Sequence, residues 1–228
     1  VVKSFAASMA ATIATLAQRL PDLGLVNAYG ATETTSPVTL LPAKLASRRP
    51  DSVGLELPCA EVIVVDPDGR EVPRGESGEL WIRGPMVVPG YWNNPEATAA
   101  SFTCGFWHSG DVGSIDAEGF VRVFDRIKDM INRGGYKIFS VEVENVLYAH
   151  PATLECAVFG LPDPHWGERV VAAVVLRPGT TATADELIAF CKARIAHYRA
   201  PKEVRFLDAL PRTGSGKITK KALRDAAR

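Results

Sequence analysis

The feature that most constrains the fold of this 228-residue chain is a change of residue pattern near Asp125. From about Cys59 to Asp125, short β-branched and aromatic runs alternate with turn signals, which is typical of β-sheet structure. After Asp125, strand-like and helix-like runs alternate, as they do in α+β domains. The chain also carries 8 basic and 11 acidic residues up to position 110, and 18 and 15 after it. The pattern therefore predicts two folded units.

The first unit is predicted to begin with a helix and then to become rich in β-structure. Apolar residues at helical spacing predict a helix over Phe5–Leu20, closed by Pro21 and Gly24. A short buried strand, Leu25–Tyr29, leads into a polar loop over residues 30–36. The later strands are expected over Glu61–Asp66, over Gly78–Arg83, and in a hairpin of Val112–Ile115 with Phe120–Phe124 around the turn Asp116–Gly119.

The second unit is predicted to alternate between helices and buried strands. Ser140 is expected to cap a helix that runs to His150, and Thr183 with Glu186 forms a capping box that opens a helix to about His197. A terminal helix is expected to start at Thr219. The strands are expected over Leu154–Phe159, Val170–Leu176 and Val204–Leu207.

The balanced composition excludes several classes of protein. The 26 Lys and Arg residues offset 26 Asp and Glu residues, whereas a surface that coats nucleic acid carries a clear basic excess. A hydrophobic fraction of 46% and a charged fraction of 23% are typical of globular proteins. No run of 18 apolar residues occurs, so we expect no transmembrane segment. Composition alone thus predicts a globular protein without a nucleic-acid partner.

Cysteine and histidine spacings exclude the common metal and redox motifs. The four cysteines, Cys59, Cys104, Cys156 and Cys191, lie 45, 52 and 35 positions apart, so no pair has the close spacing of a zinc ribbon or a CxxC motif. We expect them to be reduced and mostly buried. The four histidines show no ligand spacing either.

The first candidate site segment is Tyr29–Thr35, at the end of a predicted strand. An aromatic ring at a strand end can stack on a base, and Gly30 allows close approach of the backbone. Thr32 can donate to phosphate oxygens, and Glu33 can hold a hard cation such as Mg²⁺. A plain polar turn is the alternative explanation of the same residues.

The second candidate segment is Trp107–Asp111. A carboxylate that follows a glycine at the start of a strand can accept hydrogen bonds from both hydroxyls of a ribose. A strand-initiating aspartate without a ligand remains the alternative for Asp111.

The third and fourth candidate segments carry positive charge near glycines. Residues 125–137 combine charges with Gly134 and Gly135 where the two patterns meet, which suits a hinge or, alternatively, a solvated linker. Residues 211–218 place Lys217 beside two glycines, in a mobile loop that can bring an ammonium into a pocket. This loop is not a P-loop, because Ile218 replaces the required Ser or Thr, and a merely exposed lysine is the alternative.

Together the four segments resemble the adenylate-forming superfamily of acyl-CoA synthetases, adenylation domains and luciferases. The matching segments are YGATE (29–33), WHSGD (107–111), DRIKDMINRGGYKIFSVEVE (125–144) and PRTGSGKI (211–218). The stretches GELWIRGPMVVPGYWNNPEAT (78–98) and VFGLPDPHWGERVVAAVV (158–175) are also similar to the family. The resemblance covers nearly all of the chain from about Gly24 onward.

The resemblance implies that five residues bind the nucleotide. Tyr29 would stack on adenine, Gly30 would let the backbone approach, and Thr32 would contact the α-phosphate. Asp111 would hold the ribose hydroxyls, assisted by Arg126.

The resemblance also implies the remaining roles. Glu33 would bind Mg²⁺, and Lys217 would be the catalytic lysine that bridges the carboxylate substrate and the α-phosphate. Lys128 matches the hinge position. Gly134 and Gly135 would bind CoA by lining the tunnel for its pantetheine arm.

The fold class that the resemblance implies is α/β plus α+β. Residues 1–126 would be the C-terminal fragment of the large N-terminal domain, comprising the end of an α/β subdomain and a small β-barrel subdomain, β-rich from about residue 55. Residues 127–228 would be the mobile C-terminal α+β domain. The family's upstream Ser/Thr/Gly-rich phosphate loop has no counterpart in residues 1–28. We therefore expect an incomplete chain that is inactive alone.

The function implied is that of an acyl-CoA synthetase. Such a ligase activates a carboxylic acid with ATP, as an acyl-adenylate, and transfers the acyl group to CoA; ATP, Mg²⁺ and CoA are the implied cofactors. The resemblance also implies a fatty or aryl acid as the substrate, a role in fatty acid metabolism, a cytoplasmic location and alternation between two domain arrangements. It allows a homodimer. Two alternatives stay open: an adenylation domain that loads a carrier protein, and a non-catalytic nucleotide-binding or interaction fragment.

Overall fold

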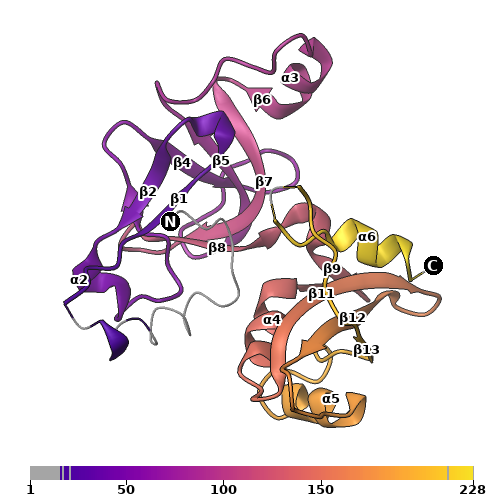
Figure 1. Ribbon diagram of the computed structural model, residues 1–228. Helices are drawn as coiled ribbons and strands as arrows, with labels where there is room; N and C mark the ends of the chain where they lie inside the picture. The colour runs from indigo at the N-terminus through magenta and orange to yellow at the C-terminus, as the bar shows by residue number, and fades with distance from the viewer. Residues whose placement is uncertain (1–15, 17, 21, 215, 228) are drawn as a thin grey trace. The chain divides into compact units, whose positions relative to one another are not determined.

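The computed structural model describes residues 16, 18–20, 22–214 and 216–227. The predicted helix over Phe5–Leu20 lies almost entirely outside the described residues. The chain forms two compact units, one ending at Ile127 and the other beginning at Lys128 (Figure 1). Both combine helices and sheets, so the fold is mixed α/β, as expected.

The first sheet of the first unit contains the strand that leads into the Tyr29 segment. Its strands are β1 (Asn27–Gly30), β2 (Pro37–Leu41) and β3 (Leu55–Glu56), antiparallel in the order β1-β2-β3. A one-turn 3-10 helix, η1 (Thr32–Thr34), joins β1 to β2, and a short helix, α2 (Ala43–Ala46), follows. The sequence pattern predicted β1 but not β2, which begins with Pro37, a residue that argues against a strand.

The second sheet carries the Trp107–Asp111 segment on its longest strand. Its order is β4-β5-β7-β6, and β8 pairs with β7. The predicted strands and hairpin of this region are confirmed, and the Asp116–Gly119 turn closes with a 3.0 Å hydrogen bond from Gly119 N to Asp116 O. The elements are β4 (Glu61–Val65), β5 (Ser77–Arg83), α3 (Pro95–Ser101), β6 (Phe102–Thr103), β7 (Phe106–Ile115) and β8 (Val121–Arg126).

One hydrophobic core joins the two sheets of the first unit. The first sheet contributes Tyr29 and Val38, and the second contributes strand residues whose side chains alternate inward. This shared core fixes the end of β1 against β7, where the candidate residues lie. The second-sheet members of this core are Val62, Val64, Leu80, Ile82, Trp107, Ile115 and Val121.

The second unit is built around a five-stranded sheet. Its order is β10-β9-β12-β11, and β13 pairs in parallel with β12. The strands predicted from the sequence appear, with β11 longer than expected. The elements are η2 (Ile127–Asp129), β9 (Ile131–Arg133), β10 (Tyr136–Ile138), α4 (Ser140–Tyr148), β11 (Thr153–Asp163), β12 (Gly167–Leu176), α5 (Ala184–Lys192), β13 (Glu203–Phe206) and α6 (Lys220–Asp225).

Helices cover both faces of this sheet (Figure 1). Alternate residues of β11 point to opposite faces, so Val158 packs with α4 and α5, whereas Phe159 packs with α6. Both faces are therefore buried, which is why β11 and β12 read as continuous apolar runs in the sequence. Among the described residues, no helix is long and apolar enough to cross a membrane.

Three local expectations need correction. Ser140 does not cap α4 but is its first residue, and its Oγ accepts a hydrogen bond from Lys220 Nζ. The Thr183 capping box is confirmed, but α5 ends at Lys192, before His197. The cysteines are free, as expected, yet only two of the four are buried; Cys59 and Cys104 are exposed because both lie in turns.

Candidate functional site

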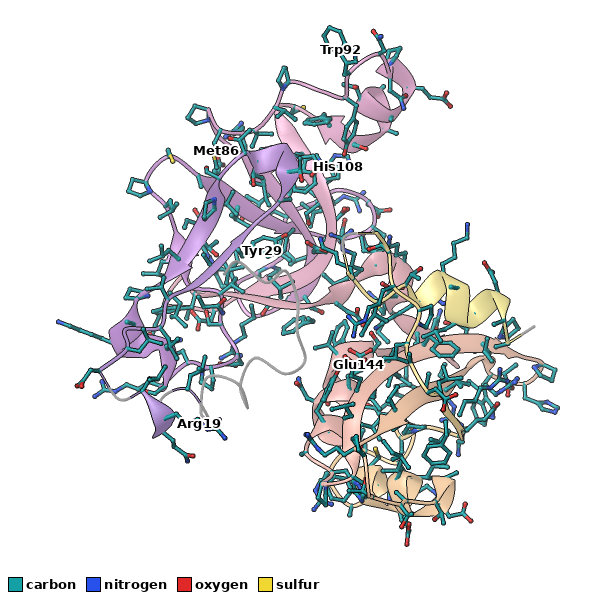
Figure 2. All side chains as sticks on the ribbon, viewed as in Figure 1. Arg19, Tyr29, Met86, Trp92, His108 and Glu144 are labelled. Carbon is teal, nitrogen blue, oxygen red and sulfur yellow. The ribbon has the colours of Figure 1, made fainter. Side chains whose placement is uncertain are left out.

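Tyr29 is the last residue but one of β1 and lies inside the shared core of the first unit (Figure 2). Its side chain is only 6% exposed, and its hydroxyl donates a 2.7 Å hydrogen bond to Asp111 Oδ2. Burial raises the pKa of Tyr29 well above its usual value, and the neighbouring Asp111 charge adds to this. The phenol therefore stays protonated and acts as a donor. Stacking of this ring on adenine stays a prediction, since little of the ring is accessible.

Asp111 is placed by a bulge in β7. Val112 pairs with Glu79 and His108 pairs with Trp81, so residues 109–111 together face a single residue of β5. Gly110 supplies the left-handed backbone that this path requires, with φ of 68°. The sequence pattern placed Asp111 at the start of a strand, whereas it lies within β7, directly after the glycine of the bulge.

Asp111 and Arg126 face each other across the β7–β8 pair. Arg126 Nε lies 3.0 Å from Asp111 Oδ1, and the Asp111 side chain is 3% exposed. This pair is close but lacks hydrogen-bond geometry, so Oδ1 is a buried atom without a hydrogen-bond partner among the described residues. A buried polar atom of this kind is unusual and indicates a missing donor.

The charge state of Asp111 depends on opposing effects. Burial raises the pKa of its carboxyl, whereas the hydrogen bond from Tyr29 and the charge of Arg126 lower it; Asp125 and Glu79 add to the rise. The net result is a pKa of Asp111 above its usual value, and Tyr29 and Arg126 limit this rise. Of the predicted nucleotide-binding residues, the structure brings these three together.

The loop after Tyr29 folds tightly back on itself. A Cβ at Gly30 would lie 2.7 Å from the backbone oxygen of Ser36, so only glycine fits there. Thr32 is exposed at the start of η1. Glu33 Oε1 accepts a 3.0 Å hydrogen bond from the Tyr91 hydroxyl, which in turn lies 3.3 Å from Trp107 Nε1. The sequence pattern assigned no role to Tyr91, although this residue lies within the segment 78–98 that resembles the family.

Glu33 is compatible with a magnesium ion that is shared with a substrate. Mg²⁺ is usually held by one or two carboxylates together with phosphate oxygens and water. Tyr91 occupies one Glu33 oxygen, and the described residues contain no cluster of three or more His, Cys, Asp or Glu that could hold a metal alone. The residues therefore fit an ion completed by substrate phosphates.

Lys128 begins the second unit within η2. Arg224 of α6 donates to the Lys128 carbonyl oxygen at 3.2 Å and pairs with Asp129 at 2.9 Å. The Lys128 side chain is exposed. The first residues of the second unit are therefore tied to α6, with the unit boundary directly before them.

Gly134 and Gly135 form a two-residue turn between β9 and β10, where Arg133 pairs with Tyr136. Their φ angles are 58° and 86°, as a type I′ hairpin turn requires. A Cβ at Gly134 would meet the Trp166 ring at 2.8 Å, whereas Gly135 has open space around it. The segment is therefore an ordered hairpin, not a solvated linker.

Lys217 is exposed on a small hairpin that precedes α6. Arg212 and Ile218 form an isolated antiparallel β-bridge, and Thr213 N donates a 2.8 Å hydrogen bond to Lys217 O. Arg212 Nη1 donates to Gly216 O at 2.8 Å, and its guanidinium also pairs with Glu155 of β11. Ser215 lies outside the described residues. The segment predicted as a mobile loop thus has several hydrogen bonds of its own.

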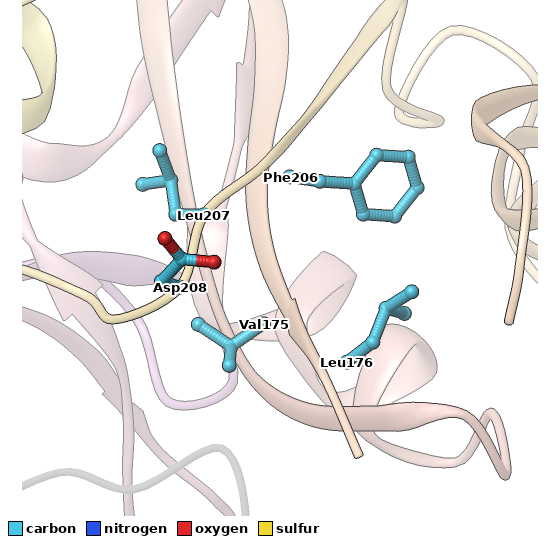
Figure 3. A pocket seen from close by; sticks show the side chains of 5 residues that line it. All are labelled: Val175, Leu176, Phe206, Leu207 and Asp208. Carbon is cyan, nitrogen blue, oxygen red and sulfur yellow. The ribbon is translucent and has the colours of Figure 1, made fainter. Parts of the chain in front are cut away.

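A shallow hollow of about 300 Å³ lies at the ends of β12 and β13 (Figure 3). It is lined by Val175, Leu176, Phe206, Leu207 and Asp208. Only one of these side chains is charged, and none is a predicted site residue. The hollow therefore lacks the converging polar groups that a binding site requires.

Two family models match the chain. The model described as "AMP-binding enzyme" matches residues 2–92, and the model described as "AMP-binding enzyme C-terminal domain" matches residues 142–217.

Curated relatives and solved structures agree with these matches. A feruloyl-CoA synthase from Amycolatopsis sp is 46% identical over 213 residues, covering 92% of this chain and 43% of the relative. An oxalate–CoA ligase from Arabidopsis thaliana is 38% identical over 221 residues, covering 96% and 43%. Among solved structures, the o-succinylbenzoate CoA synthetase of Bacillus subtilis, in complex with its acyl-adenylate intermediate, superposes with a TM-score of 0.87 at 35% identity, covering 96% and 43%. The chain therefore spans less than half the length of each of these proteins.

Proposed function

Because this chain belongs to the AMP-binding enzyme family, we propose that it forms part of an ATP-dependent, AMP-forming carboxylic acid–CoA ligase. In the first half-reaction, a carboxylate oxygen attacks the α-phosphorus of ATP and pyrophosphate leaves. In the second, the CoA thiol attacks the acyl carbon and AMP leaves. The observation that carries the proposal is the buried Asp111 oxygen without a hydrogen-bond partner among the described residues.

Asp111 is proposed to bind the ribose of ATP. A carboxylate can accept hydrogen bonds from two neighbouring hydroxyls, and Oδ1 still has this capacity. Arg126, 3.0 Å away, favours the ionised form that such acceptance requires. Tyr29 is proposed to contact adenine beside this carboxylate, with Gly30 and Thr32 next to the phosphates.

Glu33 is proposed to bind Mg²⁺, which would neutralise part of the charge on the phosphates when it is bound. The Tyr91 hydroxyl holds one Glu33 oxygen in place and so restricts the rotation of its carboxylate. Glu33 would thus present its carboxylate in a fixed orientation.

The two units are proposed to be parts of two domains. Residues 1–126 would belong to the large N-terminal domain, as the end of its α/β subdomain and its small β-barrel subdomain, and residues 127–228 would be the mobile C-terminal domain. Lys128, at the unit boundary, is proposed as the hinge. Gly134 and Gly135 are proposed to line the path of the pantetheine arm, where Gly135 leaves open space.

The acid is proposed to be a fatty or aryl carboxylic acid, and the location to be cytoplasmic. The names of the relatives support this range, since they include a feruloyl-CoA synthase and a long-chain-fatty-acid–CoA ligase. Loading of a carrier protein is the alternative for the second half-reaction.

We expect these 228 residues to be inactive alone, but to give an active ligase when they are joined to the N-terminal part of a related enzyme. In a hybrid ligase, this chain would replace the matching 213-residue segment of the Amycolatopsis feruloyl-CoA synthase. The purified chain should show no carboxylate-dependent exchange of pyrophosphate into ATP, because it spans only part of the fold, whereas the hybrid should form feruloyl-CoA.

Each outcome of this experiment is informative. Exchange by the chain alone would contradict the expected inactivity. A folded hybrid that forms no adenylate would contradict the ligase proposal. A hybrid that forms the adenylate but transfers it only to a carrier protein would support the alternative acceptor.

A second prediction concerns the hinge. In the hybrid, Lys128→Pro should spare adenylation but slow thioester formation by at least about tenfold, because proline fixes φ and restricts the residue before it. The carbonyl that accepts from Arg224 is retained in this variant. Rapid-quench assays of each half-reaction measure the effect, with Lys128→Ala as the control. Equal losses in both half-reactions would remove support for the hinge.

A further inference from the structure

We infer that Glu79 is a positioning residue that holds the bulge of β7 so that Asp111 presents its carboxylate to a ribose. The inference rests on the proposed function, because it concerns the same ribose site. Glu79 lies on β5 and does not itself contact Asp111 through a hydrogen bond; it acts on the backbone of the preceding residue.

Both oxygens of Glu79 are used by groups at the bulge. Glu79 Oε1 accepts a 2.9 Å hydrogen bond from Gly110 N, and Oε2 accepts a 3.0 Å hydrogen bond from Trp81 Nε1. The Trp81 ring stacks on His108 with ring centroids 3.9 Å apart and planes at 10°. The Glu79 carboxylate thus connects the backbone of the bulge with the stacked pair of Trp81 on β5 and His108 on β7.

The bulge needs such a support because its backbone leaves the regular ladder. Residues 109–111 face one residue of β5, so amides in this stretch lose their strand partners. The Ser109 hydroxyl accepts from Asp111 N at 3.0 Å, and Glu79 satisfies Gly110 N. An amide left without an acceptor in this half-buried place would favour a different backbone path.

Glutamate is suited to this position in a way that glutamine is not. Gly110 N and Trp81 Nε1 are both donors, so the side chain between them must accept at both ends. A carboxylate does so, whereas a carboxamide has one acceptor oxygen and one donor nitrogen. Glu79→Gln should therefore lose one of the two hydrogen bonds, and Glu79→Ala should lose both.

The first measurement tests the support itself, in the purified 228-residue chain. Glu79→Ala should speed amide hydrogen exchange at Gly110 by about three- to tenfold, the size expected for one lost hydrogen bond, and Glu79→Gln should have a smaller effect. Exchange within the β4–β5 pairs should change little. Glu61→Gln is the matched control, because Glu61 is an exposed glutamate on the same sheet, paired with Arg83. Unchanged Gly110 exchange in both Glu79 variants would overturn the inference.

The second measurement tests the link to Asp111 through its pH dependence. Tyr29, Arg126, Asp125 and Glu79 all influence the pKa of Asp111, and Glu79 raises it. Glu79→Gln should therefore shift the titration of the Asp111 carboxyl, followed by carbon NMR, to lower pH. An unchanged titration would show that the Glu79 carboxylate does not act on the Asp111 site, and that result would count against the inference.

The third measurement uses AMP and 2′,3′-dideoxy-AMP as probes. The wild-type chain should bind AMP about tenfold or more tightly than the dideoxy compound, as hydrogen bonds to a charged group imply, and Glu79→Ala should reduce this ratio to about two or less. A wild-type chain that binds the two compounds equally would refute the proposed ribose site, even where Gly110 exchange depends on Glu79. A preference that Glu79→Ala leaves unchanged would refute the positioning role alone.

Discussion

Lys217→Ala in the hybrid ligase is expected to lower the rate of adenylation by about 10²–10³-fold, the usual cost of removing one electrostatic contact from a transition state. The attacking carboxylate and the α-phosphate are both anionic, and charge increases on the phosphoryl oxygens as the bond forms. Lys217 is exposed and makes no salt bridge within the described residues, so its ammonium remains available to offset such a charge. Pyrophosphate exchange into ATP measures this effect.

Two comparisons separate this role from a structural one. Lys221→Ala removes another exposed lysine, on α6, and should leave the rate unchanged. Thioester formation from a separately prepared acyl-adenylate should persist in Lys217→Ala, because the thiol then attacks the acyl carbon and no bond to the α-phosphorus is formed. If Lys217→Ala slowed both half-reactions equally, or less than about tenfold, Lys217 would not be the adenylation lysine.

Lys220→Met is expected to lower the free energy of unfolding of the second unit by about 3–5 kcal/mol, because it removes the cation that is paired with a buried carboxylate. Lys220 Nζ lies 2.8 Å from Glu144 Oε1, and the two side chains are only 14% and 9% exposed. The same Glu144 oxygen accepts a 2.8 Å hydrogen bond from Val158 N, and Lys220 also donates to Ser140. The pair thus joins α6, α4 and β11.

Urea unfolding, followed at the amide resonances of β11 and β12, measures this loss. The double variant Glu144→Gln with Lys220→Met should recover much of it, because glutamine removes the buried charge and still offers an acceptor to Val158 N. Arg169→Met is the control, since its pair with Glu203 is about one-third exposed and should contribute less than about 1 kcal/mol. A loss in Lys220→Met no larger than this control would show that the buried pair is not stabilising.

Much of the fold could be predicted because local patterns report local structure. Periodicity and turn residues identified β4, β5, the hairpin around Asp116–Gly119 and the capping box at Thr183, where neighbouring residues decide the backbone. Helix α3 was missed although its start signals are local: Asn94 caps it and Pro95 stands in its first turn. Strand β2 was missed because it begins with Pro37, a residue that argues against a strand. The predicted cap at Ser140 was wrong, and the Ser140 hydroxyl instead accepts a hydrogen bond from a lysine 80 residues away.

By itself, the sequence determined the family and the candidate residues, since motifs such as YGATE and PRTGSGKI keep their spacing along the chain. Only the tertiary structure decided which of these residues meet. Tyr29 and Asp111 are 82 positions apart, yet they share a 2.7 Å hydrogen bond, and Arg126 reaches the same carboxylate across a strand pair. Glu79 and Lys220 showed no role in the sequence, because a hydrogen bond to a bulge or a buried charge depends on packing. Long-range contacts of this kind depend on the registers of whole strands, which no short motif encodes.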